Sequence, residues 1–271
     1  MNNTITYTDE QIQKVAPSVF ATDSWSETSK RYRFIPTTTV LNKLRDKGYN
    51  VTNVQQSRTR IEGKGEFTKH LLRLRHDDYV NPVNVGDEVP EIVLVNSHDR
   101  TSSYQIYLGI FRLVCTNGLI VASTKIESLK IRHSGSGHLN RQILRIADKV
   151  SSEAPKVFNR ISEYKTIDLD QDQQIDFATK ARDILKTTLD VQPERLLRVR
   201  RYADRGNGTN TLWNVSNIVQ ENIVRGGVLA RNSQGNFRHT SQIKNIQNNV
   251  RVNRELWKLT DDIALARQSL N

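Results

Sequence analysis

A run of four consecutive apolar residues, Ile92-Val93-Leu94-Val95, is the feature that most constrains how this chain folds. A strand with one face in water alternates apolar and polar side chains, so an unbroken apolar run predicts a strand covered on both faces. Hydrophobic residues make up only 36% of the 271-residue chain, so we expect an extensive surface or an elongated shape. The length suits one large domain, or a medium domain with an appendage.

Two segments that precede this run, residues 51–60 and 67–75, have the alternating pattern of half-buried strands. Gly63 and Gly65 separate the segments, so we expect them to form a hairpin. Polar and basic side chains share one face of each predicted strand: Gln56, Arg58 and Arg60 in the first, and Lys69, Arg73 and Arg75 in the second.

Residues 102–116 predict a helix, because Tyr104, Leu108, Phe111 and Cys115 recur at helical spacing, and Asn117-Gly118 would end it. Residues 119–132 return to an extended pattern, with Lys130 and Arg132 on one face. The rest of the chain predicts helices, the first of them kinked or broken at Pro155.

These segments predict an α+β fold: an antiparallel sheet with crossing helices in the N-terminal half, followed by a helical C-terminal half. Residues 1–166 would form a mixed α/β core with a basic sheet face, and residues 167–271 a helical region. Flexible loops are expected near 203–211 and 228–243. Trp213 and Trp257 lie on apolar faces of late helices, so we expect core positions or anchors of a subunit interface, in a chain that associates with copies of itself.

The net charge is +11, and the basic excess is unevenly distributed. Residues 52–76, 123–160 and 193–258 carry net charges of +4, +5 and +8, and acidic stretches separate them. A clustered positive surface attracts polyanions, although a solvated face with scattered ion pairs is the alternative. The predicted nucleic-acid site contains Gln56, Arg58, Arg60, Lys69, Arg73, Arg75, Arg112, Lys130, Arg132 and His133.

A search for catalytic motifs is mostly negative. The chain has no phosphate loop or dinucleotide fingerprint, and we expect no metal and no cofactor. His98 and Asp99 fit a turn at the end of a strand. Cys115 is the only cysteine and has apolar neighbours, so we expect a buried thiol in a reducing, cytoplasmic compartment. No apolar stretch is long enough to span a membrane, and the polar N-terminus predicts no secretory signal.

Several strings in the chain resemble the domain-of-unknown-function 932 family, also called phage/plasmid-like proteins. They are residues 15–21 (VAPSVFA), 32–40 (YRFIPTTTV), 55–60 (QQSRTR), 67–70 (FTKH), 90–99 (PEIVLVNSHD), 111–119 (FRLVCTNGL), 219–227 (VQENIVRGG) and 252–257 (VNRELW). The resemblance implies a phage, prophage or plasmid origin and a bacterial host, but it brings no active site. The expected architecture is also similar to that of single-strand annealing proteins of the RecT and Red-beta kind.

Three hypotheses follow from these features. The first is a protein that binds or anneals single-stranded DNA in recombination or replication, gripping the backbone and leaving the base edges free. The second is an interaction protein that blocks a host defence or regulatory complex. The third is a nucleic-acid-modifying enzyme built on His98, Asp99 and His133.

Overall fold

The computed structural model describes residues 6–79, 88–112, 115–120, 129–131, 139–200 and 210–268. The chain divides into two compact units. The first unit contains Met1–Leu113 and Thr124–Ala154, and the second contains Val114–Ser123 and Pro155–Asn271. The division therefore falls between Ala154 and Pro155 rather than at residue 166, and a short segment from the N-terminal half joins the second unit.

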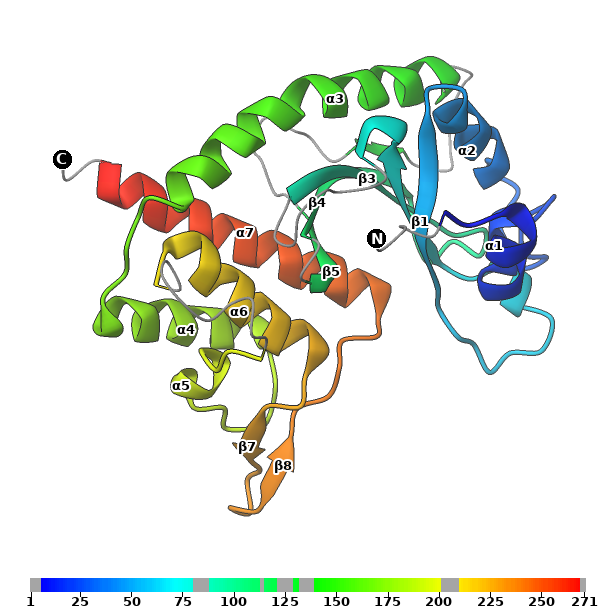
Figure 1. Ribbon diagram of the computed structural model, residues 1–271. Helices are drawn as coiled ribbons and strands as arrows, with labels where there is room; N and C mark the ends of the chain where they lie inside the picture. The colour runs from blue at the N-terminus through cyan, green and yellow to red at the C-terminus, as the bar shows by residue number, and fades with distance from the viewer. Residues whose placement is uncertain are drawn as a thin grey trace. The chain divides into compact units, whose positions relative to one another are not determined.

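An antiparallel sheet organises the first unit (Figure 1). Its strands β1 (Tyr49–Gln56), β2 (His70–His76), β3 (Glu88–Asn96) and β4 (Tyr104–Arg112) are neighbours in chain order, and β6 (Leu129–Ile131) also pairs with β4. The apolar run in β3 lies in the centre of this sheet, and its four side chains are at most 1% exposed. The predicted α+β class and the doubly covered strand are thus confirmed.

The helix predicted over residues 102–116 is wrong. Residues 104–112 form β4, which pairs antiparallel with β3 along its length, for example Leu108 with Ile92. Asn117-Gly118, the predicted helix end, lies inside strand β5 (Cys115–Ile120). Residues 104–110 are all buried, so this strand lacks the polar alternation that identifies a half-buried strand. The apolar side chains therefore matched a helical spacing by coincidence.

Short helices accompany the sheet of the first unit: α1 (Asp9–Val15), η1 (Pro17–Phe20), α2 (Thr37–Arg45), η2 (Gly65–Phe67) and η3 (Asp77–Tyr79). Helix α1 starts with a capping box, in which Thr8 accepts from the Gln11 backbone and the Gln11 side chain accepts from the Thr8 backbone. Strand β1 ends earlier than predicted, at Gln56, so Arg58 and Arg60 lie in the following loop.

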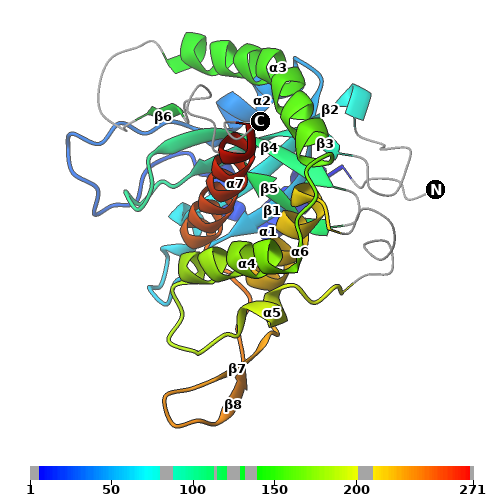
Figure 2. The same cartoon turned by 90° about the vertical axis from the view of Figure 1, so that its left-hand side faces the viewer.

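The second unit is mainly helical, with α4 (Gln171–Leu185), α5 (Pro193–Leu196), α6 (Leu212–Arg225) and α7 (Ile246–Gln268) (Figure 2). Strand β5 packs against α6 and α7. Helix α3 (Leu139–Tyr164) runs through Pro155, so the predicted interruption there is not a break. No helix among the described residues is long and apolar enough to cross a membrane.

Residues near 228–243 form a hairpin rather than the predicted flexible loop. Strand β7 (Leu229–Arg231) pairs antiparallel with β8 (Phe237–His239). The Asp190 backbone also exchanges two hydrogen bonds with Arg231, which tie the hairpin to the segment before α5. The other predicted loop, near 203–211, lies almost entirely outside the described residues.

Trp213 and Trp257 are core residues of the second unit, the first of the two roles expected for them. Each is 1% exposed, and their ring centroids lie 6.4 Å apart in an edge-to-face arrangement. Tyr164 completes the cluster, with its ring centroid 5.9 Å from that of Trp257. Aromatic rings packed in this way are buried inside the unit and offer no surface to a second chain.

Candidate anion-binding pocket

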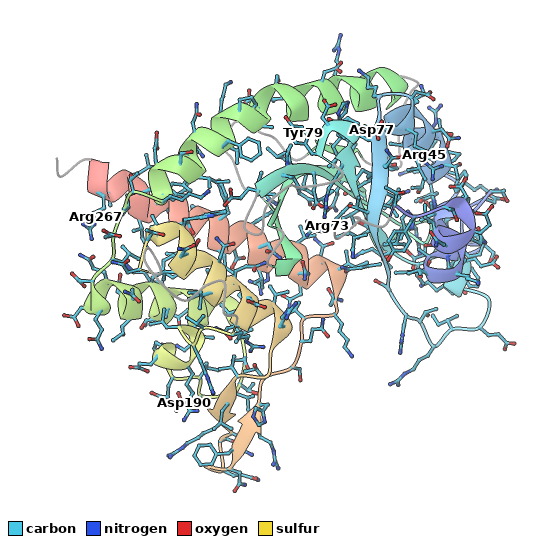
Figure 3. The ribbon with its side chains drawn as sticks, viewed as in Figure 1. Arg45, Arg73, Asp77, Tyr79, Asp190 and Arg267 are labelled. Atoms are coloured by element: carbon cyan, nitrogen blue, oxygen red, sulfur yellow. The ribbon has the colours of Figure 1, made fainter. Side chains whose placement is uncertain are left out.

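Two central arginines of the predicted basic sheet face, Arg73 and Arg75, are buried and paired with a carboxylate. Arg73 and Arg75 are 6% and 3% exposed. Figure 3 labels Arg73 beside the strands of this sheet. Arg73 Nη1 donates to one carboxylate oxygen of Glu91 at 2.8 Å, and Arg75 Nε donates to the other at 2.7 Å. A guanidinium held in this way is not available to a phosphate. Residues 70–75 of β2 are all buried, so the side chains on both faces of this strand are covered.

The other residues of the predicted sheet face differ in their burial and hydrogen bonding. Gln56 accepts hydrogen bonds from the backbone and hydroxyl of Ser18, and Lys69 is half-buried, where desolvation lowers its pKa. Arg58 and Arg60 are exposed, as a phosphate contact requires, but they lie in a loop. The side chains of Arg112 and Lys130 lie outside the described part of the structure, as do residues Arg132 and His133 altogether. So does the side chain of Cys115.

His98, the proposed catalytic residue of the enzyme hypothesis, is fully buried in a polar network. The hydroxyl of Thr37 lies 3.3 Å from Nε2 of His98 and 2.9 Å from Nε2 of His70. The Ser18 hydroxyl lies 2.8 Å from the other ring nitrogen of His70. Burial, helped by the charge of His98, lowers the pKa of His70 to about 3. The network joins α2, η1 and the sheet, and a phosphodiester does not reach His98 in this packing.

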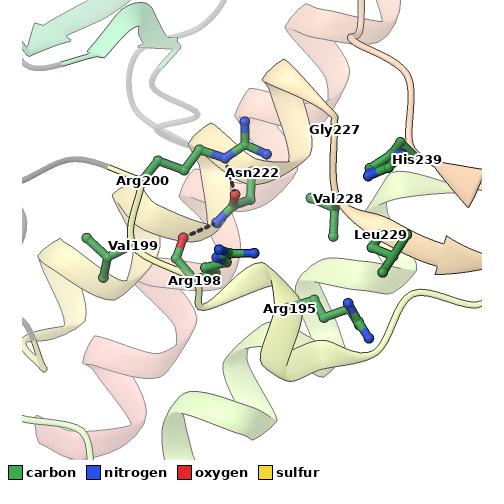
Figure 4. Close-up of a pocket in the computed structure, with 9 residues that line it drawn as sticks. All are labelled: Arg195, Arg198, Val199, Arg200, Asn222, Gly227, Val228, Leu229 and His239. Atoms are coloured by element: carbon green, nitrogen blue, oxygen red, sulfur yellow. Dashed lines mark hydrogen bonds between the residues drawn. The ribbon is translucent and has the colours of Figure 1, made fainter.

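The cationic side chains that share a cavity are in the second unit. A pocket of about 470 Å³ is lined by Arg195, Arg198, Arg200 and His239 (Figure 4). Arg195 lies in α5, Arg198 and Arg200 follow it, and His239 belongs to the hairpin. All four side chains are exposed. Val228 and Leu229, where the chain enters β7, provide the apolar wall.

Hydrogen bonds from α6 hold the arginine segment in place. The buried Asn222 side chain donates to the carbonyl oxygens of Leu196, at 2.7 Å, and Arg198, at 3.0 Å. Its own oxygen accepts from Arg200 Nε, while Arg200 Nη2 donates to the carbonyl of Gly226. One amide thus fixes the backbone on which the arginines are spaced.

A glycine permits the close approach of chains at the pocket edge. Gly226 ends α6 with φ +67°, and an added Cβ atom would lie 2.4 Å from the backbone carbon of Ser241. Any side chain would therefore displace one of the two segments. Gly226 also has the positive φ that commonly ends a helix, so the helix end and the close packing both require a glycine there.

The positive charge of the pocket is not neutralised by carboxylates within the described residues. The guanidinium groups of Arg195, Arg198 and Arg200 form no ion pair there. Partial burial lowers the pKa of Arg200, and the charges of Arg225 and Arg198 lower it further, against the opposing effect of Glu221. That carboxylate already pairs with Arg225 at 3.1 Å. An anion in the pocket would relieve this crowding of cations.

The sequence contains a signal for this pocket in the spacing of its arginines. Residues 193–258 have the largest positive charge of the three basic segments, +8, but a helical region offers no period-two face on which to place it. The signal was the local spacing of Arg195, Arg198 and Arg200 after Pro193, where a single helical turn gives way to extended chain. The hairpin that supplies His239 is distant in sequence, in a segment for which the sequence predicts a loop.

Comparison with known proteins places these features in a family context. The family model described as "Domain of unknown function (DUF932)" matches residues 25–257. The chain is 35% identical over 264 residues to UPF0380 protein YafZ of Escherichia coli (strain K12), covering 94% of this chain and 90% of that protein. It is 34% identical over 259 residues to UPF0380 protein YfjQ of the same strain, covering 94% and 91%. No solved structure matches the chain.

Proposed function

Because this chain belongs to the DUF932 family, whose description records no activity, we propose a function from its own geometry: it binds single-stranded DNA by its phosphates in the arginine pocket. The observation that carries this proposal is the convergence of Arg195, Arg198 and Arg200 on one cavity without a carboxylate partner among the described residues. Guanidinium groups match the geometry of phosphate oxygens, and release of counterions from the strand drives the binding.

A concave pocket favours a single strand over a duplex. The backbone of a single strand bends at each nucleotide and can place one phosphate inside the cavity. A duplex has a persistence length of about 50 nm and presents its phosphates on a stiff convex surface. The exposed Arg58 and Arg60 of the first unit are further candidate contacts with the backbone.

The biological role that we propose is binding or annealing of strands in recombination or replication. Contacts to phosphates leave most base edges free, as pairing with a complementary strand requires. The setting that we propose is the cytoplasm of a bacterium, supported by the Escherichia coli relatives and by the single cysteine. A phage or plasmid origin fits this role.

The test is a salt titration of oligonucleotide binding by fluorescence anisotropy. Arg195 and Arg198 are the residues to change, because their exposed side chains donate no hydrogen bond within the described residues. Each phosphate contact with a single strand contributes about 0.7 to the slope of log K against log salt concentration. An Arg195→Gln/Arg198→Gln variant should therefore flatten the slope by about 1.4 and weaken binding about 25-fold at 0.1 M salt.

Arg182→Gln is the matched control, because it removes an arginine from α4 in the same unit but outside the pocket. This control should bind like the unaltered chain. Equal losses in the control and the double variant would mean that net charge matters and the pocket does not. Binding of the unaltered chain that is insensitive to salt between about 50 and 200 mM would refute the phosphate contacts altogether. A protein partner recovered after nuclease treatment would instead favour the interaction hypothesis.

A further inference from the structure

A second cavity adjoins the arginine pocket and differs from it in chemistry. It measures about 270 Å³ and is lined by Asp190, Gln192, Arg195, Ala230, Arg231 and Phe237. Arg195 lines both cavities, so the two are neighbours across one side chain. The second cavity contains a carboxylate, an amide and an aromatic ring, whereas the first has only cationic and neutral groups. A phosphate suits the first cavity, and the carboxylate of Asp190 disfavours one in the second.

The aromatic ring of this side cavity is exposed yet held in position. Phe237 is 54% exposed, which leaves much of its ring open to solvent. The guanidinium carbon of Arg231 lies 5.0 Å from the ring centroid, within the range of a cation–π interaction. Both residues belong to the β7–β8 hairpin, where they pair across the strands. The ring is therefore presented on a rigid element.

Hydrogen-bonding groups form another part of the wall. The Gln192 side chain donates to Asp190 Oδ2 at 3.0 Å, so each residue orients the other. Asp190 is also fixed through its backbone, which bonds to Arg231 in both directions. A flat ligand lying on Phe237 thus meets a carboxylate that accepts from N–H groups and an amide with remaining donor and acceptor capacity.

From this arrangement we infer that the side cavity binds a nucleobase of the strand whose phosphate occupies the arginine pocket. The inference rests on the proposed function and makes it more specific. A base offers a π face for Phe237 and Arg231 and N–H groups for Asp190, while the phosphate attached to its sugar reaches Arg195. Bases stack on aromatic side chains with little sequence preference, so this contact suits a protein that binds strands generally. One base is held, and its neighbours stay free to pair.

The experiment compares a base-bearing oligonucleotide with an abasic one of equal length, because the two carry the same phosphates. The unaltered chain should bind the base-bearing strand about 5- to 150-fold more tightly, the range expected for one stacked base. Phe237→Leu keeps an apolar side chain without a ring and should remove that ratio while leaving the salt slope unchanged. Tyr79→Leu, which changes an exposed aromatic residue of the first unit, is the matched control and should keep the ratio.

The outcomes separate this inference from the proposed function. Equal, salt-dependent binding of both strands would overturn the base site and leave the phosphate pocket standing. A ratio that survives in Phe237→Leu would also overturn the base site, since the stacking would then occur elsewhere. Absence of binding to either strand would remove the proposed function and this inference together. Displacement of the strand by a phosphotyrosine peptide but not by a mononucleotide would assign the cavity to a protein ligand and refute the base site.

Discussion

Glu91→Gln is expected to destabilise the first unit strongly, because this one carboxylate compensates two buried arginines. Glu91 is 1% exposed and gives one oxygen to Arg73 and the other to Arg75. Glutamine has nearly the same shape, so the substitution changes the charge without creating a cavity. It leaves two guanidinium groups in a covered layer of the sheet without the negative charge of Glu91.

The magnitude follows from the burial of all three groups. Removing one partner from a buried ion pair costs about 3–5 kcal/mol, whereas loss of an exposed pair costs about 0–1 kcal/mol. The amide oxygen of glutamine still accepts one hydrogen bond, which places the expected loss near the lower end, about 3 kcal/mol. For a protein of this size that loss lowers the melting temperature by about 6–12 °C.

Calorimetry and urea unfolding of the unaltered chain, Glu91→Gln and Glu62→Gln measure this difference. Glu62 is an exposed carboxylate in the loop after β1, so its substitution should change the unfolding free energy by less than about 0.5 kcal/mol. Replacement of the whole triad by Met, Met and Leu should recover much of the stability. Equal melting temperatures for the two glutamine variants would refute the buried triad and reopen the case for Arg73 and Arg75 as ligand contacts.

Two further predictions concern the backbone and the buried histidine. Gly226→Ala should lower the unfolding free energy by about 2–3 kcal/mol and weaken oligonucleotide binding. The control Gly235→Ala, at φ +80° with open space around it, should lower the unfolding free energy by about 1 kcal/mol. Similar melting temperatures for the two variants would contradict the close approach of Gly226 to Ser241. Burial holds the folded-state pKa of His70 near 3, below its ordinary value of 6.5. Below pH 6.5 the unfolded chain therefore binds a proton on this histidine that the folded chain does not. Stability that is fully present above pH 6.5 is lost as the pH falls. Between pH 6.5 and 5 the unfolding free energy should fall by up to about 1.4 kcal/mol per pH unit more than in His70→Gln, and parallel urea-unfolding curves would contradict this.

Much of the architecture could be predicted because it depends on neighbours in the chain. The capping box at Thr8, the end of α6 at Gly226 and the apolar run in β3 each depend on a few adjacent residues. Strand β4 could not be predicted in the same way. Its covered faces remove the alternation that reveals a strand, and its pairing with β3 is a tertiary event.

The basic residues show the same limit for the site. A period-two pattern correctly placed Arg73 and Arg75 on one face of a strand, but it cannot tell whether that face meets water or a carboxylate on the next strand. Glu91, an acid beside an otherwise apolar run, was the available hint. The arginine pocket could not be predicted because its parts are far apart in the sequence. His239 comes from a hairpin about forty residues after α5.

Local patterns in the amino acids were thus sufficient for the α+β class, for most helices and for the family resemblance, because short-range sterics and hydrophobic periodicity act within a few residues. Whether a charged side chain is buried in an ion pair or exposed to solvent depends on how distant segments pack together. A guanidinium is neutralised or left open by whichever group the fold brings within a few ångströms, and Coulomb energies depend on that distance and on burial rather than on position in the chain.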